Sequence, residues 1–177
     1  MDVFWQPWSG PGAEHLRLVR RPDGSFEAGG TMIRSLGDAP IRVDYIIRCD
    51  DAWRTERAEV SCGERHILLG AASIAALDCI DVDIMGMTFT NTLPIRRLQL
   101  KVGASAQIAA AFVVVPDLVT RRERQRYTRL SENEYRYEGL GTGFTSVLTV
   151  DDEGIVIDYP QLSRRIWPRD ILPAPRK

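Results

Sequence analysis

A regular alternation of apolar and polar residues runs through most of this 177-residue chain. In residues 97–102, leucine or valine alternates with arginine, glutamine and lysine, and residues 43–48, 134–138 and 144–150 show similar patterns. Successive side chains of a β-strand point to opposite faces, so each segment would bury one face and expose the other. Burial on one face is typical of antiparallel sheets. The sequence therefore predicts a mostly β fold.

Turn sequences separate these segments. Pro22-Asp23-Gly24, Ser131-Glu132-Asn133 and Asp151-Asp152-Glu153-Gly154 each lie between two strand-like runs, as expected for hairpins. About a dozen short strands fit the chain. We expect little helix, because the one alanine-rich stretch, residues 71–77, is short.

Length and composition indicate one globular domain over residues 1–177, with an extended proline-rich tail at residues 168–177. Basic and acidic residues number 23 and 24, so the formal net charge is −1. A charge this close to zero argues against a nucleic-acid partner. The three cysteines, Cys49, Cys62 and Cys79, are odd in number and widely spaced, so a disulfide framework is not expected.

The N-terminal residues lack both the basic and the apolar regions of a signal peptide. No segment approaches the roughly 20 apolar residues that cross a bilayer as a helix. We therefore expect a cytoplasmic protein without integral membrane association. The sequence leaves its oligomeric state open.

Residues 106–115 differ from the alternating segments because they are apolar on both faces after Gln107. Two interpretations remain open. The segment is a central strand covered on both sides, or one of its faces lines a cavity that the small residues Ala109, Ala110 and Ala111 allow a ligand to approach.

Asp81 and Asp83 form the most suggestive polar pair. On one strand they would share a face about 6.6 Å apart, which is near the carboxylate separation of inverting glycosidases. Alternatively, they pair with Arg96 or Arg97 or cap turns, as structural aspartates commonly do.

Other patterns indicate no catalytic, cofactor or metal site. His15 and His66 lack the spacing of metal ligands, and no nucleophile-elbow sequence is present. The glycines of residues 139–144 precede a strand-like run rather than a helix, so a bend is expected there and not a phosphate loop. The arginines of residues 121–129 form either a solvated strand or a surface for an anionic headgroup or RNA. Residues 90–94 are predicted to form a loop, because Pro94 favours an extended Leu93.

Four segments together resemble a known family: residues 78–84 (DCIDVDI), 90–98 (TNTLPIRRL), 125–127 (QRY) and 150–160 (VDDEGIVIDYP). They are similar to the bacterial "putative glycolipid-binding" family, formerly a domain of unknown function. The early segment 43–53 resembles that family's first strands. The resemblance implies a curved antiparallel sheet that forms an open cone or half-barrel, a β-roll similar to lipoprotein carriers that enclose lipid tails.

This resemblance favours a non-enzymatic protein that binds a lipid or glycolipid-like amphiphile in the concavity of an incomplete barrel. Apolar pockets with a few placed polar groups are the usual form of small-molecule sites. The ligand-binding candidates are Asp81, Asp83, Asn91, Arg96, Arg97, Tyr127 and Tyr159. Arg96 and Arg97 would adjoin on one strand and point to opposite faces, so one of them would face the ligand. The alternatives are a hydrolase that uses Asp81 and Asp83, and a structural or protein-interaction module.

Overall fold

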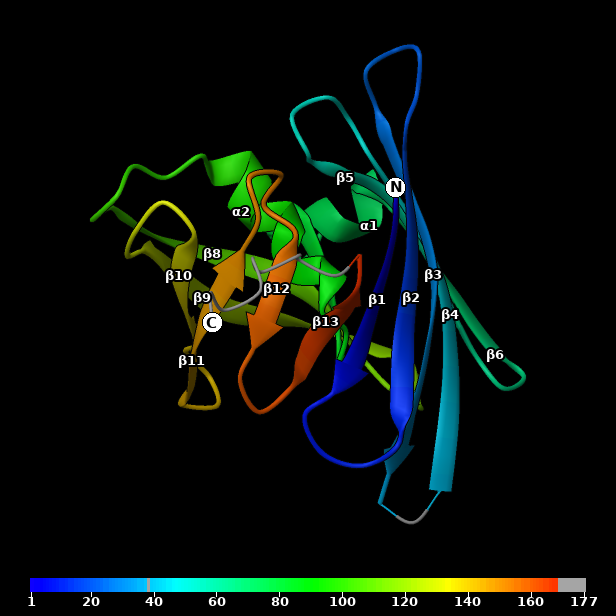
Figure 1. The fold of residues 1–177 in the computed structure, drawn as a ribbon. Helices are drawn as coiled ribbons and strands as arrows, with labels where there is room; N and C mark the ends of the chain where they lie inside the picture. The colour runs from blue at the N-terminus through cyan, green and yellow to red at the C-terminus, as the bar shows by residue number, and fades with distance from the viewer. Residues whose placement is uncertain (38, 169–177) are drawn as a thin grey trace, which may run out of the picture.

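Thirteen strands form one continuous curved sheet in the computed structural model, which describes residues 1–37 and 39–168 (Figure 1). The strands are β1 (Asp2–Pro7), β2 (Gly12–Arg20), β3 (Phe26–Leu36), β4 (Ala39–Cys49), β5 (Thr55–Cys62), β6 (Arg65–Gly70), β7 (Asp81–Ile84), β8 (Ser105–Val114), β9 (Val119–Arg129), β10 (Glu134–Gly139), β11 (Phe144–Val150), β12 (Val156–Tyr159) and β13 (Ser163–Trp167). The prediction of a mostly β chain with about a dozen strands is confirmed. The predicted tail falls mostly on residues 169–177, outside the described residues.

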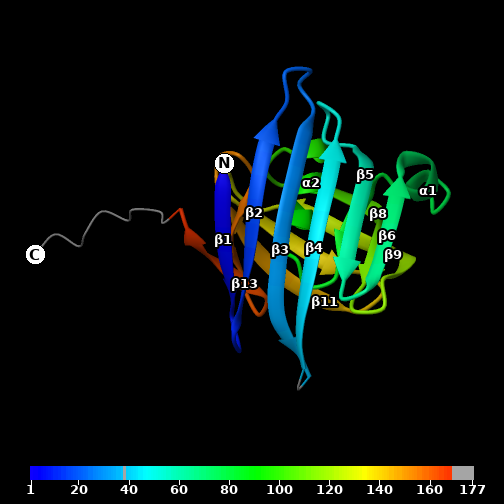
Figure 2. The same ribbon diagram turned by 90° about the vertical axis from the view of Figure 1, so that its right-hand side faces the viewer.

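Two antiparallel meanders build the sheet. Strands β1 to β6 follow one another in space as in sequence (Figure 2), and so do β8 to β13. Strands β1 and β13 pair and join the two halves, and β7 adds to β8 in parallel. In the described residues no ladder joins the edge strands β6 and β7, so the sheet curves without closing.

The three predicted hairpins form, and short side chains stabilise their turns. Asp23 accepts hydrogen bonds from the backbone and the hydroxyl of Ser25 between β2 and β3. Asp151 accepts hydrogen bonds from the backbone N–H groups of Glu153 and Ile155 between β11 and β12. Aspartate commonly bonds the backbone two residues ahead in this way.

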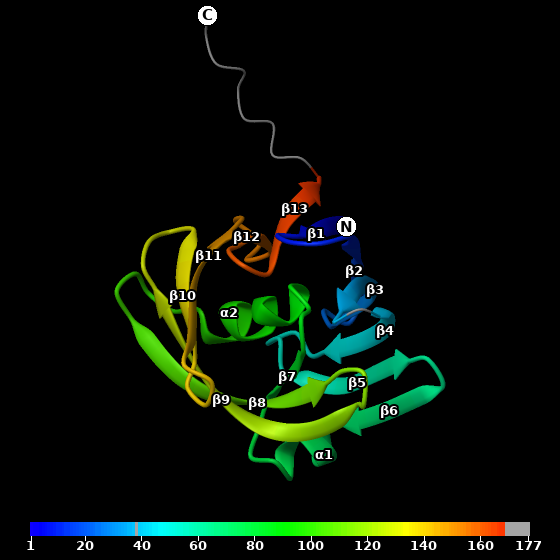
Figure 3. The same ribbon diagram turned by 90° about the horizontal axis from the view of Figure 1, so that it is seen from below.

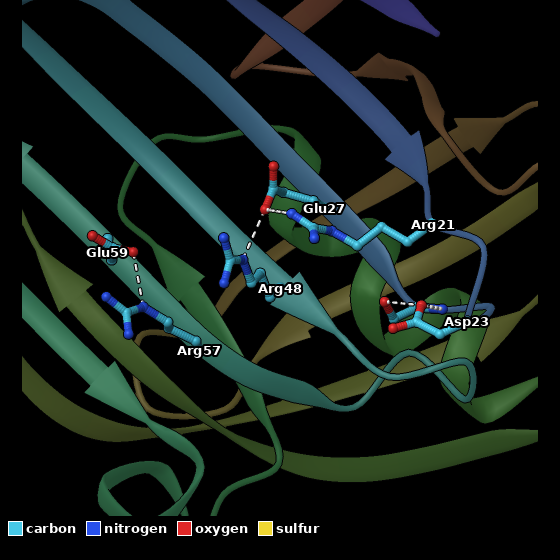
Figure 4. Close-up of polar contacts among 7 residues, drawn as sticks. Arg21, Asp23, Glu27, Arg48, Arg57 and Glu59 are labelled. Atoms are coloured by element: carbon cyan, nitrogen blue, oxygen red, sulfur yellow. Dashed lines mark hydrogen bonds and ion pairs between the residues drawn. The ribbon is translucent and has the colours of Figure 1, made fainter.

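The outer face of β2 to β5 is charged, as the alternation predicts. Glu27 on β3 pairs with both Arg21 and Arg48, and Arg57 pairs with Glu59 on β5 (Figure 4). The inner face of the same strands is apolar and buried; it includes Met32, Val43, Tyr45, Ile47 and Val60. One-sided burial is therefore confirmed for this half of the sheet.

A short helical segment lies inside the concavity (Figure 3). It consists of the 3-10 turn η1 (Phe89–Asn91) and the helix α2 (Thr92–Leu98). Phe89 and Leu93 pack into the core of the first meander, and Ile95 packs into the core of the second. The middle of the concavity is thus filled by the chain itself. The other helix, α1 (Ala71–Ala75), lies in the short alanine-rich stretch. Within the described part of the chain, no helix is long and apolar enough to cross a membrane.

The interior helix corrects two predictions. Residues 90–94 are not a loop, and the alternating residues 97–102 are not a strand, since α2 runs from Thr92 to Leu98. Pro94 is tolerated because it is the third residue of α2, where a backbone N–H has no partner within the helix. Arg96 and Arg97 consequently lie on a helix and not on one strand.

Residues 106–115 form most of β8, and the interpretation as a strand covered on both sides holds at its centre. The neighbours Ala110 and Ala111 point to opposite faces of the sheet and are both buried, so the strand is covered on both sides there. Phe112 on the same strand lines a cavity, but Ala109, Ala110 and Ala111, which the alternative interpretation placed beside a ligand, do not line that cavity.

Gly30 and Gly29 on β3 make a matched test of the packing between β2 and β4. A Cβ at Gly30 would lie 2.5 Å from the ring of Tyr45 and from the carbonyl oxygen of His15, whereas a Cβ at Gly29 meets nothing within 4 Å. Overpacking of this kind costs about 2–3 kcal/mol. We expect Gly30→Ala to lower the free energy of unfolding in urea by that amount, and Gly29→Ala to leave it unchanged or slightly higher. Equal effects of the two substitutions would contradict this packing.

Candidate ligand-binding site

Cavities lie at both ends of the interior helix. A cleft of about 800 Å³ flanks its C-terminal end and is lined by Ile95, Arg96 and Gln99; we call it the polar cleft. At the other end lie two adjoining pockets that share Met85, Gly86 and Leu162. The inner pocket measures about 250 Å³ and includes Asn91 and Phe112, and the outer pocket measures about 340 Å³.

The walls of the inner pocket are mainly apolar and aromatic. Tyr137, Phe144 and Tyr159 form an aromatic group on β10 to β12, with ring centroids 6.1–6.2 Å apart. Phe112 and Met87 lie among the other lining residues. Rings at such distances are in the range of favourable aromatic pairs, so this wall is a packed surface that a ligand can contact.

A hydrogen-bonded network forms the polar floor of the inner pocket. Asp83, on β7, accepts bonds from the Thr90 hydroxyl (2.7 Å) and from the Gln125 side-chain amide (2.6 Å). The Tyr127 hydroxyl donates to the side-chain oxygen of Asn91 (3.0 Å), and a second contact (3.3 Å) joins it to Gln125. Asp83 and Asn91 line the pocket itself. The floor therefore presents a carboxyl and an amide that the network holds in place.

Burial shifts the pKa values of the ionisable side chains in and around this floor. It raises the pKa of Asp83, and the hydrogen bonds from Thr90 and Gln125 offset part of that increase. Burial also raises the pKa values of Tyr127, Tyr137 and Tyr159 well above the ordinary value of 10.0. The three phenols stay neutral at physiological pH and can donate hydrogen bonds. Hydroxyl-bearing ligands suit such a mixture of donors and acceptors.

Asp81 lies on the same face of β7 as Asp83, but it forms an ion pair and does not line the inner pocket. It is 1% exposed and forms a two-point ion pair with Arg97, at 2.9 Å to the Nε and 2.5 Å to the Nη2. Neither residue lines the inner or the outer pocket. The structure thus favours the structural interpretation of Asp81, as a partner that holds α2 against β7.

Arg96 points to the opposite end of the helix. Its guanidinium lies 5.2 Å from the ring centroid of Trp53 and 3.6 Å from the carboxylate of Glu153, at the polar cleft. Arg20 and Arg129 cover the rings of Phe26 and Tyr135 in the same cleft. Most of the surface that lines this cleft is therefore polar, whereas most of the surface that lines the inner and outer pockets is apolar.

The seven candidates are therefore not one site. Asp83, Asn91 and Tyr159 line the inner pocket, and Tyr127 supports it from behind. The sequence prediction missed Gln125, although the period-two pattern places it on the same strand face as Tyr127. Within residues 1–37 and 39–168, no three His, Cys, Asp or Glu side chains are grouped so that they could hold a metal ion.

Comparison with known proteins gives the chain its family. The family model described as "Putative glycolipid-binding" matches residues 2–165. A crystal structure of a DUF1089 family protein from Pseudomonas aeruginosa is 35% identical and has a TM-score of 0.77; the match covers 90% of this chain and 95% of that one. No curated protein matches the chain. The match spans nearly all described residues, and the chain belongs to the family described as "Putative glycolipid-binding".

Proposed function

We propose that this protein binds a lipid or glycolipid-like amphiphile in the inner and outer pockets, without catalysing a reaction. The observation that carries the proposal is the apolar inner pocket with Asp83 and Asn91 on its floor. Buried polar groups orient a ligand, and apolar walls supply most of the binding energy. The membership of the family supports the same class of ligand.

The interior helix limits how much of the concavity a ligand can use. Since η1 and α2 fill the middle, an acyl chain occupies one end and not the whole interior. The two adjoining pockets, of about 340 and 250 Å³, together fall within the range of roughly 300–1,000 Å³ that is usual for small-molecule sites. A short or bent chain suits this space.

The position of Asp81 argues against a hydrolase that uses Asp81 and Asp83 as its catalytic pair. A glycosidase needs two carboxyl groups that flank one bond of the substrate. Asp83 faces the inner pocket, but Asp81 is tied to Arg97 outside it. The proposed catalytic pair is therefore not presented to a common ligand.

Filling the pockets tests this proposal. Leu162 lines both of them, so we expect Leu162→Trp to weaken binding of decanoate and octyl β-D-glucoside, each below its critical micelle concentration, by at least about ten-fold in calorimetric titration. Leu68→Trp is the matched control, because Leu68 is 49% exposed on β6. This variant should bind both amphiphiles as the unchanged protein does. If neither amphiphile binds the unchanged protein, or if Leu162→Trp binds both normally, the pockets are not the site.

A further inference from the structure

We propose that the ligand carries an anionic oxygen group, a carboxylate or a phosphate, and that Arg34 binds this group at the outer pocket. This inference rests on the proposed function and specifies the polar end of the amphiphile. Among the described residues, Arg34 is the one charged residue that lines the outer pocket. The other described residues of this pocket are uncharged, and they include Ile41, Met85, Val115 and Leu162.

The local backbone is shaped around the Arg34 side chain. The Nη2 group donates to the carbonyl oxygen of Leu162 at 3.2 Å. On the other side the guanidinium lies against Gly86, where an added Cβ would be 2.8 Å from Nη1. Gly86 also has a φ of +81°, a conformation that glycine adopts readily. Glycine at position 86 thus lets the guanidinium reach the pocket wall.

Most of the N–H donors of the Arg34 guanidinium are available to a ligand. Among the described residues, no carboxylate forms an ion pair with its guanidinium, and the bond to the Leu162 carbonyl is the one hydrogen bond that it makes. Burial lowers the pKa of Arg34 and the charge of Glu14 raises it, yet arginine remains protonated in proteins. The oxygens of Glu14 accept hydrogen bonds from the backbone N–H groups of Thr88 and Phe89 and from the Tyr45 hydroxyl.

The other arginine at these pockets is already paired. Arg121 lines the inner pocket, and its Nε lies 3.4 Å from the carboxylate of Glu123. A half-buried guanidinium without a carboxylate partner, as in Arg34, favours an anion from outside. The planar fork of arginine suits two oxygens of a carboxylate or phosphate.

The pockets also set the direction of the chain. From Arg34, the apolar wall continues through Met85 and Leu162, which both pockets share, to Phe112 and Phe144 of the inner pocket. An anionic head at Arg34 therefore leaves the acyl chain to run inward. A free anion would leave these apolar surfaces uncovered, so the chemistry fits an anionic amphiphile.

A series of ten-carbon probes tests the inference. Decanoate and decyl phosphate should bind about ten- to a hundred-fold more tightly than 1-decanol, because a hydrogen bond to a charged group is stronger than a neutral one. Acetate and inorganic phosphate, which lack the chain, should bind far more weakly than the corresponding ten-carbon compounds. Arg34→Gln should remove the preference for the anions, and Arg34→Lys should restore part of it. Arg17→Gln, a change at an exposed position on β2, should leave all affinities unaltered.

The outcomes separate this inference from the proposed function. If 1-decanol binds as tightly as decanoate, or Arg34→Gln binds both probes as the unchanged protein does, the anionic head is refuted while amphiphile binding stands. If inorganic phosphate binds as tightly as decyl phosphate, the site takes a free anion and this inference fails. If no ten-carbon probe binds, the proposed function fails with it. The comparison of decanoate with 1-decanol on the unchanged protein decides the matter even if Arg34→Gln does not fold.

Discussion

Arg97→Met is expected to lower the free energy of unfolding by about 3–5 kcal/mol, because it leaves the Asp81 carboxyl buried without its partner. Chemical denaturation at pH 7 measures this loss. The loss also depends on pH. Burial already raises the pKa of Asp81, and the hydrogen bond and charge of Arg97 counter that effect. Without Arg97 the folded-state pKa rises further above the unfolded value, so the destabilisation is full above the folded pKa and fades as the pH falls towards the unfolded pKa.

A double replacement is the control for this prediction. Removing both charges, in Asp81→Leu with Arg97→Met, leaves no unpaired ion, and such exchanges are often neutral for stability. We expect the double variant to recover most of the stability that Arg97→Met loses. A double variant as unstable as the single one would show that Arg97 acts through packing and not through the charge of Asp81.

Glu14→Ala is expected to cost about 3–4 kcal/mol. The buried Glu14 carboxylate accepts hydrogen bonds from the backbone N–H groups of Thr88 (2.7 Å) and Phe89 (3.3 Å) and from the Tyr45 hydroxyl (3.3 Å). Its removal leaves buried donors unsatisfied, and each such group costs about 1–3 kcal/mol. Urea denaturation measures the loss of stability, and amide chemical shifts of residues 88–93 report whether the helical segment moves.

An exposed glutamate provides the comparison. Glu27 pairs with Arg21 and Arg48 on the outer face, where ion pairs contribute about 1 kcal/mol or less (Figure 4). Glu27→Ala should therefore cost much less than Glu14→Ala. Similar losses for the two variants would contradict the inference that the buried hydrogen bonds of Glu14 stabilise the protein more than an exposed ion pair does.

The sheet was predictable because its signals are local. Alternation and turn residues such as Asp23 and Asp151 act within a few positions, and the hairpins form where they indicate. The interior helix was not predictable in this way. Residues 97–102 alternate like a strand, and Pro94 suggests a break, but the packing of Phe89 and Leu93 against the sheet decides the conformation.

The site was predictable in part. The family motif contains Asp83 and Asn91, and the alternative in which an aspartate pairs with Arg96 or Arg97 holds for Asp81. No local pattern indicates that Asp81 pairs with arginine while Asp83 lines the pocket. The sequence also contains a pattern that indicates the position of Arg34. Ala28 and Met32 of β3 are buried, and the period of two places Arg34 on their face. The alternation therefore predicts that the Arg34 side chain points inward at the end of an apolar strand face.

The methionine methyl groups offer the most direct measurement of whether an amphiphile occupies the inner and outer pockets. The chain has four methionines; Met85 lines both pockets, Met87 lines the inner one, and Met1 is 53% exposed. In protein labelled with ¹³C at the methionine methyl groups, decanoate should shift the signals of Met85 and Met87 and give intermolecular Overhauser effects from both to its chain, while Met1 stays unchanged. Binding of decanoate without any effect on Met85 and Met87 would contradict the account, because the amphiphile would then lie elsewhere on the molecule.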